Sequence, residues 1–335
     1  MTLDDAALAL VRASQPKALP HLAQRTGAEV ASAAAVLDDH GWSADPATYH
    51  RLPQCLSADD VTTIACRAWP RRHELAVFPS GFYPRSIEPA ADRWRRGTPN
   101  NAVQVRLLRH RTPARPWVVC LHGFGMGASR FDLILLWANH FHQKLGFNVA
   151  VPVLPFHGPR RSPGDGRLLS LDLAMTLHAI TQSIWDIRRL IHWIRLVGGE
   201  AVGVYGLSLG GYLAALLAGI EPVDAVVAGI PFTDVLTLMT HHRAPVEYRD
   251  ILGGDAARDT FRVVSPLTLS PKVPPNRLAL FAGRTDRLVP AEHAAALAHA
   301  WHGSPVHRYP AGHTGYLRSR QTKAFVTHFL RSALA

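Results

Sequence analysis

The chain has 335 residues, of which 47% are hydrophobic and 18% are charged, and its formal net charge is +11. This length and apolar content allow a large buried core and exclude a disordered chain, while no apolar run reaches the roughly 18 residues of a membrane span. The three cysteines form no CxxC motif, so neither a disulfide framework nor a metal site is expected.

Residues 1–70 are predicted to form a helical and irregular extension. Apolar residues recur at helical spacing before and after a break at Pro16, and Gly41 is suited to end the second helix. Residues 43–100 are rich in proline and turns, with a short strand expected at 74–78. Because the start contains Asp4 and Asp5 where an export signal would be basic, we expect a cytoplasmic protein.

Residues 67–115 contain eleven arginines and three acidic residues, which account for +8 of the net charge. Part of this segment is predicted to be a strand at 102–108, with Val103, Val105 and Leu107 on a buried face and Gln104, Arg106 and Leu108 on a solvated one. Since no nucleic-acid-binding motif accompanies the charge, nucleic acid is not expected as a partner. At most, we expect weak peripheral association with an anionic membrane surface.

After residue 116, short apolar strands alternate with helices. The expected strands are 117–121, 149–153, 201–205, 225–228, 278–281 and 306–309, and the expected helices are 180–197, 209–218, 293–301 and 322–334. Short, fully apolar strands are typical of parallel strands buried on both faces. The order predicts an α/β fold with a doubly wound, mostly parallel sheet and helices on both faces.

The sequence GLSLG at positions 206–210 lies between an expected strand and an expected helix. A G-x-S-x-G pattern in this place predicts a sharp turn that exposes the hydroxyl of Ser208, with Gly206 and Gly210 leaving room for the crowded backbone. The helix that follows presents its N-terminus, where the backbone dipole favours negative charge. Ser208 is therefore the candidate nucleophile.

A serine hydroxyl needs a base to take its proton and a carboxylate to orient that base. Asp286 and His313 each come directly after an expected strand, in the order Ser, acid, His. We interpret Asp286 as the acid and His313 as the base. Asp234, after the strand at 225–228, is the alternative acid, but Asp286 is favoured because a role in forming the turn explains Asp234 more naturally.

The sequence HGFG at positions 122–125 follows the strand at 117–121. Gly123 and Gly125 allow a backbone N–H to face the site, and we expect the amides of Phe124 and Leu209 to form an oxyanion hole. The ring of His122 is expected to hold this loop rather than to act in catalysis.

These motifs together resemble those of an α/β-hydrolase over roughly residues 75–335. Within that superfamily the chain is similar to the dienelactone hydrolase and prolyl-oligopeptidase-like esterase branch. It most resembles the abhydrolase domain-containing protein 18 group, through PFHGPRR at 155–161, SLGG at 208–211 and GHTGY at 312–316. The resemblance implies a catalytic domain over 71–335 with serine hydrolase chemistry and no cofactor, and it fixes no substrate.

Two insertions, near 156–174 and 235–270, are expected to form a small cap that shapes the substrate site. His157, Leu236 and Met239 are the pocket candidates. Leucines lie beside arginines such as Arg160 in these segments, which suggests an acyl chain with an anionic or lipid-like head group.

The sequence thus predicts a serine esterase that cleaves carboxylic esters through an acyl-enzyme. Two alternatives stay open: an acyltransferase with the same three residues, and a binding protein that keeps the fold without catalysis. The sequence does not define an oligomeric state.

Overall fold

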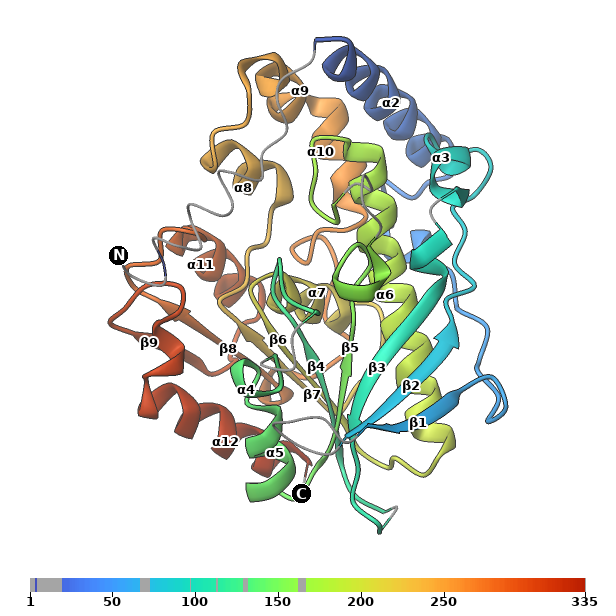
Figure 1. Ribbon diagram of the computed structural model, residues 1–335. Coiled ribbons are helices and arrows are strands. Elements are labelled where there is room, and N and C mark those ends of the chain that lie inside the picture. The colour runs from blue at the N-terminus through green and yellow to red at the C-terminus, as the bar shows by residue number, and fades with distance from the viewer. Residues whose placement is uncertain are drawn as a thin grey trace.

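The computed structural model describes Asp4 and residues 20–66, 73–96, 98–112, 114–128, 132–161 and 167–334 (Figure 1). Apart from Asp4, the helix expected before Pro16 lies outside the described residues. The same holds for Arg67, Arg71 and Arg72 of the arginine-rich segment.

A single mixed sheet forms the centre of the molecule. Within the described residues it has nine strands in the order β1-β2-β3-β5-β4-β6-β7-β8-β9, in which the first three pairings are antiparallel and the remaining five are parallel. The strands are β1 Thr62–Cys66, β2 His73–Pro79, β3 Ala102–Leu108, β4 Trp117–Leu121, β5 Asn148–Pro152, β6 Val202–Leu207, β7 Ala225–Gly229, β8 Leu278–Gly283 and β9 Val306–Tyr309. The predicted α/β fold with a mostly parallel sheet is confirmed.

Helices cover both faces of this sheet (Figure 1). They are α2 Pro20–Asp39, α3 Ala91–Arg95, α4 Asp132–Leu135, α5 Ala138–Lys144, α6 Leu173–Leu196, α7 Leu209–Ala218, α8 Val235–His241, α9 Arg249–Gly253, α10 Asp255–Arg262, α11 Ala291–Ala300 and α12 Arg320–Leu334. Short 3-10 helices are η1 Pro46–Tyr49, η2 Thr98–Asn101, η3 Gly158–Arg160, η4 Val246–Tyr248, η5 Pro275–Arg277 and η6 Gly315–Leu317. No helix within the described ranges is long and apolar enough to cross a membrane.

The core is divided into two clusters by the sheet. In β4, Trp117 and Val119 pack in the cluster that contains α6 and α7, whereas Val118 and Cys120 pack with α4, α5 and α12. Successive side chains of a strand point to opposite faces, so a strand covered on both sides must be apolar throughout. This explains why the central strands are continuous apolar runs in the sequence.

The expectation that one side of β3 is solvated is wrong. Leu108 is buried in the cluster of α5 and α12, and the side chain of Arg106 is only 12% exposed. The loop after β4 covers this side of the strand at Arg106, whereas Gln104 stays partly exposed.

The described part of the N-terminal extension is joined to the catalytic segment. Strand β1, within residues 1–70, pairs with β2 at the edge of the sheet. Helix α2 lies beside α9 and α10 of the 235–270 insertion (Figure 1), and Thr260 Oγ1 donates to the carbonyl of Val30 at 3.2 Å. The insertion and α2 therefore form one helical layer.

Most described arginines of the 67–115 segment have acidic partners. The ion pairs are Arg85–Glu88, Arg93–Glu29, Arg95–Asp92, Arg106–Asp132 and Arg109–Glu74. Arg93 also contacts Asp172, the N-cap of α6, and so ties α3 to two other helices. Ion pairs within the structure thus offset much of the positive charge of this segment.

Candidate active site

Ser208 occupies a strained turn between β6 and α7. Its φ is +56° and its ψ is −113°, a conformation that costs an L residue about 1–3 kcal/mol. A Cβ atom on Gly206 would lie 2.0 Å from the carbonyl oxygen of Gly210, and one on Gly210 would lie 2.1 Å from that of Leu121. The chain therefore needs glycine at both positions to make this turn, which leaves Ser208 partly exposed.

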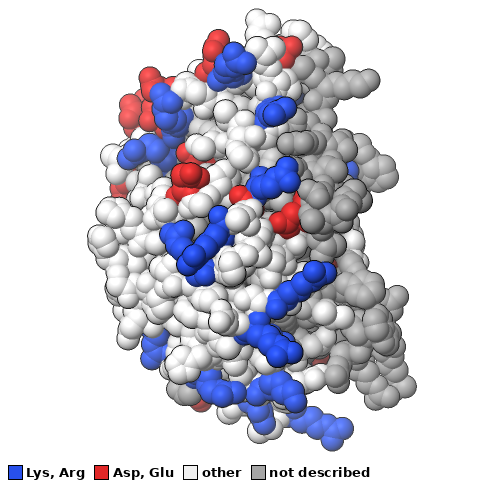
Figure 2. All heavy atoms as spheres, turned by 90° about the vertical axis from the view of Figure 1, so that its left-hand side faces the viewer, with Lys and Arg blue, Asp and Glu red and all other residues white. Residues whose placement is uncertain are grey.

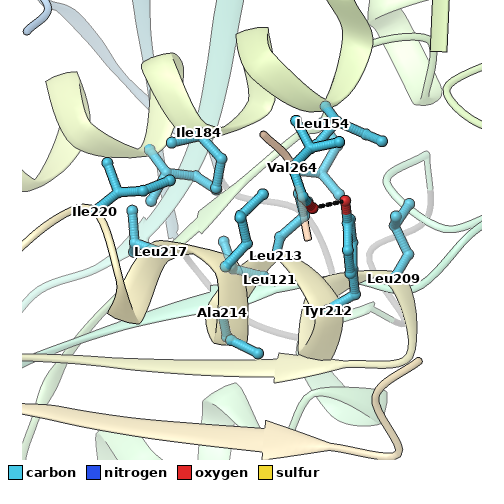
Figure 3. Close-up of a cluster of buried hydrophobic side chains, with 14 of the residues drawn as sticks. Leu121, Leu154, Ile184, Leu209, Tyr212, Leu213, Ala214, Leu217, Ile220 and Val264 are labelled. Atoms are coloured by element: carbon cyan, nitrogen blue, oxygen red, sulfur yellow. Dashed lines mark hydrogen bonds between the residues drawn. The ribbon is translucent and has the colours of Figure 1, made fainter. Parts of the chain in front are cut away.

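The helix that begins after Ser208 is buried along its whole length. Figure 3 shows its apolar side chains packed below α6, where Ile184 lies, and the Tyr212 hydroxyl donates to the carbonyl of Val264 at 2.5 Å. A helix held on all sides cannot shift its first turn easily. The N-terminus of α7 is thus a fixed feature next to the Ser208 hydroxyl.

The loops after β6, β8 and β9 lie at one edge of the sheet. Main-chain hydrogen bonds continue the pairing past the strand ends: Ser208 N–H donates to Gly229 O at 2.9 Å, and Arg284 N–H donates to Tyr309 O at 2.9 Å. Ligand sites of open α/β sheets lie at this carboxyl edge. Ser208, Asp286 and His313 all belong to these loops.

Asp286 and His313 are in direct contact. The distance between Asp286 Oδ2 and His313 Nδ1 is 2.7 Å, and the two side chains are 4% and 10% exposed. The other carboxylate oxygen of Asp286 accepts the N–H groups of Leu288 at 2.9 Å and Val289 at 3.0 Å. Because a carboxylate can only accept, the His313 proton is on Nδ1 and Nε2 is left as a base.

The alternative acid, Asp234, has a different role. It is the N-cap of α8, where its side chain accepts the N–H of Thr237 at 2.9 Å, and it is exposed. An aspartate in this position satisfies an orphan helix N–H. The capping of α8 therefore explains why an aspartate occupies position 234, and no role in the active site is needed.

The His313 loop has two further supports that sequence reasoning did not find. Tyr309 donates its hydroxyl to the carbonyl of His313 at 3.3 Å. Asp4 accepts the N–H of Thr314 at 2.9 Å and its hydroxyl at 2.7 Å. No local pattern could have indicated the second contact, because it joins residues separated by 310 positions.

The loop after β4 brings Gly123 next to the nucleophile. A Cβ atom on Gly123 would lie 3.7 Å from Ser208 Cβ, and Gly125 has a φ of +78°. Among the described residues, none accepts the N–H of the half-exposed Phe124. Leu209 is the first residue of α7, so its N–H has no acceptor within the helix. Both amides are thus available at this edge.

His122 supports this loop from within the core. Its Nδ1 lies 2.9 Å from Gly123 O, and its Nε2 accepts the N–H of Leu154 at 3.1 Å, so the ring carries its proton on Nδ1. Burial holds the pKa of His122 well below its usual value. The ring is therefore neutral and fixed by two main-chain contacts.

An ion pair holds the far end of the same loop. Arg106 Nη2 donates to Gly127 O at 3.0 Å, Asp132 Oδ2 accepts Gly127 N–H at 2.9 Å, and Arg106 Nη1 lies 3.6 Å from Asp132 Oδ2. Both peptide groups of Gly127 are thereby fixed. The sequence offered no signal for this arrangement, since Arg106 reads as the polar side of a strand.

The expected pocket residues lie in different surroundings. His157 is buried, with its ring edge-on to Phe124 at a centroid distance of 5.7 Å. Leu236 belongs to the main core, and Met239 packs against that core while partly exposed. Arg160 is 1% exposed and bound to Asp186 at 2.7 Å, so the idea that it meets an anionic head group is wrong.

A groove of about 420 Å³ lies beside Asp286. The ends of α8 and α11 border it, and its lining residues are His241, His242, Arg243, Asp286, Arg287, Pro290, Ala291 and Glu292. The 235–270 insertion therefore contributes directly to the surroundings of the candidate acid.

Two family models match the chain. The model described as Prolyl oligopeptidase family matches residues 187–315, and the one described as Alpha/beta hydrolase domain containing 18 matches residues 87–250. The first range contains Ser208, Asp286 and His313, and the second contains the loop after β4.

Solved structures share the fold at low sequence identity. Acetyl xylan esterase 1 of Thermoanaerobacterium sp. JW/SL YS485 is 15% identical, with a TM-score of 0.61, over 89% of this chain and 94% of that one. An acetyl xylan esterase of Paenibacillus sp. R4 is 14% identical, with a TM-score of 0.59, over 87% of this chain and 99% of the other.

Two curated proteins of Mycobacterium tuberculosis are much nearer in sequence. They come from strains CDC 1551 / Oshkosh and ATCC 25618 / H37Rv and are both described as uncharacterized proteins. Each is 35% identical over 337 residues, covering 96% of this chain and 79% of the relative. The chain belongs to the α/β-hydrolase superfamily, in the same family as these two mycobacterial proteins.

Proposed function

We propose that this protein is a serine hydrolase that cleaves carboxylic esters through an acyl-enzyme. The observation that carries the proposal is the Asp286–His313 contact of 2.7 Å at the sheet edge where Ser208 leaves β6 in a strained turn. A nucleophile, a base and an orienting carboxylate on loops at one edge of the sheet are the parts that acyl transfer requires.

In the first half-reaction, His313 Nε2 takes the proton of Ser208 as the hydroxyl oxygen attacks the ester carbonyl. The negative charge that develops on the carbonyl oxygen is stabilised by the amides of Phe124 and Leu209 and by the N-terminus of α7. His313 then gives the proton to the leaving alcohol, and the acyl group stays on Ser208. Asp286 stabilises the imidazolium throughout.

In the second half-reaction, water replaces the alcohol. His313 takes a proton from the water as it attacks the acyl-enzyme, and returns it to Ser208 Oγ when the acid leaves. An acyltransferase would use an alcohol instead of water at this step. Products measured with and without an added alcohol distinguish these two outcomes.

The choice of esters over other acyl compounds is supported by the two acetyl xylan esterases that share the fold. Within the esters, we infer a substrate with an anionic group, because Arg243 lines the groove beside Asp286. Met239, from the same insertion, is the apolar candidate for contact with an acyl chain. We therefore assign contact with an anionic group to the groove beside Asp286 and no longer to the buried Arg160.

Peptide hydrolysis is the second candidate, and the Prolyl oligopeptidase family match favours it. Matched p-nitrophenyl esters and p-nitroanilides of one acyl group separate the two activities. We expect the esters to be hydrolysed and the anilides to stay intact, because a peptidase cleaves both. Enzymatic cleavage of the anilides would contradict the esterase assignment, and no hydrolysis of either would favour a binding protein.

A further inference from the structure

Positive charge without acidic partners gathers near the C-terminus. From residue 277 to the end, the chain has eight basic and two acidic residues. One of the two acids, Asp286, is occupied by His313. This balance contrasts with the 67–115 segment, whose described arginines mostly have acidic partners.

Six basic side chains of this region are exposed or half-exposed, and among the described residues none of them forms an ion pair. We call them the C-terminal basic face: Arg284, Arg308, Arg318, Arg320, Lys323 and Arg331. A single protein surface with unpaired cations attracts anions over a Debye length of about 8 Å at physiological salt.

The residues of this face come from adjoining elements. Strand β9, which carries Arg308, is an edge of the sheet, and α12 packs against it with its apolar side inward. Figure 2 shows this side of the molecule, where basic side chains extend through the middle and lower parts and acidic ones gather mainly above. Arg320, Lys323 and Arg331 lie on the outward side of α12, and the exposed Arg308 projects from the edge strand next to it.

The face adjoins the candidate active site. Arg284 lies in the same loop as Asp286, and Arg318 follows the loop of His313 at the end of η6. Any large anionic surface that contacts these cations lies beside the carboxyl edge of the sheet.

We infer that the C-terminal basic face docks on an anionic lipid surface. A lipid bilayer is favoured over single-stranded nucleic acid because binding of single strands relies on aromatic side chains for base stacking. In this region Tyr316 is buried, and the ring of Phe325 stacks on His307 at 5.3 Å. Each basic residue at an anionic membrane strengthens binding about fivefold, so several together give measurable affinity.

Docking on the lipid surface does not depend on Ser208. The further idea, that docking brings esters in the membrane to the active site, rests on the proposed function. The two can fail separately. A Ser208→Ala variant is expected to bind vesicles as the unmodified chain does.

The experiment is co-sedimentation of the full chain with vesicles of phosphatidylcholine alone or mixed with phosphatidylglycerol. We expect binding only to the mixed vesicles, weakening as salt is raised. The variant Arg308→Gln/Arg318→Gln/Arg320→Gln should bind about a hundredfold more weakly. A control variant with the same change in net charge, Arg96→Gln/Arg249→Gln/Arg262→Gln, should bind normally, since these exposed arginines lie elsewhere.

Thermal unfolding of both variants checks that they fold. Equal loss of binding in the two variants would overturn the assignment to this face, and so would equal binding to both kinds of vesicle. Tighter binding of a single-stranded RNA oligomer than of mixed vesicles at the same salt would identify nucleic acid as the partner instead.

Discussion

Asp286 connects His313 to the main chain of another loop. One carboxylate oxygen lies 2.7 Å from His313 Nδ1, and the other accepts two backbone N–H groups at 2.9 and 3.0 Å. The acid cannot rotate without breaking these bonds. The ring of His313 is thus fixed in orientation and tautomer, which is the condition for a base at Nε2.

Asp286→Asn should abolish most activity while keeping the fold. An amide can donate to Nδ1, which moves the proton of His313 to Nε2 and removes the base. We expect kcat to fall about 10⁴-fold, the size of effect seen when the wrong tautomer is enforced. Steady-state kinetics with a p-nitrophenyl ester measures this change.

Asp234→Ala is the matched test of the alternative acid. Removal of an N-cap costs about 1 kcal/mol of stability, and this variant should lose that amount in urea unfolding with kcat unchanged. A larger loss of kcat in Asp234→Ala than in Asp286→Asn would reverse the assignment of the acid.

Asp4→Ala tests the contact between the N-terminus and the His313 loop. The change removes the acceptor of the Thr314 N–H and hydroxyl, which lie 2.9 and 2.7 Å away. Since Thr314 follows His313, we expect kcat to fall about tenfold with KM unchanged, as small displacements of a catalytic group cost rates of this order or more.

Asp4→Asn keeps an acceptor oxygen and should recover part of the lost kcat. Asp39→Ala, at the exposed end of α2, removes the same charge from a remote position. An unchanged kcat in Asp4→Ala, or the same loss in Asp39→Ala, would show that this contact does not position His313.

Gly206→Ala should prevent normal folding. Its Cβ would lie 2.0 Å from the main-chain oxygen of Gly210, and neither backbone segment can move while α7 is buried. We expect a loss above about 4 kcal/mol in urea unfolding. Gly253→Ala, where nothing lies within 4 Å of the added atom, serves as the control and should stay within about 1 kcal/mol. Similar stability in the two variants would contradict the crowded turn.

Stability should fall between pH 6.5 and pH 4, and His157 is one of several buried histidines that cause this fall. Burial lowers the pKa of His157 from 6.5 to about 4, so in this window the unfolded chain binds a proton that the folded chain does not. Above pH 6.5 the neutral His157 ring does not lower the free energy of unfolding. As the pH falls from 6.5 to 4, the free energy of unfolding decreases by about 3 kcal/mol through this residue.

His157→Gln removes this proton and should reduce the decline by the share of His157, while His50 and His122 keep theirs. Urea unfolding of both proteins at a series of pH values measures the difference in slope. Parallel curves for the unmodified chain and the variant would show that His157 does not carry the effect.

Much of the fold was predictable because its elements carry their own pattern. The strands β3, β4 and β9 and helix α7 begin and end where the apolar periodicity indicates. The same holds for the turn at Ser208, where a short glycine-bounded motif meets a strand and a helix. A structural element can be predicted from its own sequence when its backbone geometry requires particular residue types at particular positions.

Features that depend on distant partners could not be predicted this way. Arg106 reads as a solvated strand residue and instead binds Gly127 and Asp132, because the loop after β4 covers it. The short helices α8, α9 and α10 gain their stability from packing on α2 and on one another, so their own sequences indicate them weakly. The sequence predicted an insertion at 235–270, but it did not predict that the insertion forms these three helices.

Covalent labelling tests the central claim most directly. A fluorophosphonate probe reacts with a serine that an adjacent base has activated, and peptide mapping by mass spectrometry locates the adduct. We predict one adduct per chain, on Ser208, with slower labelling in Asp286→Asn and none in Ser208→Ala. A probe attached to another residue, or a folded chain that resists labelling while control esterases react, would contradict the account.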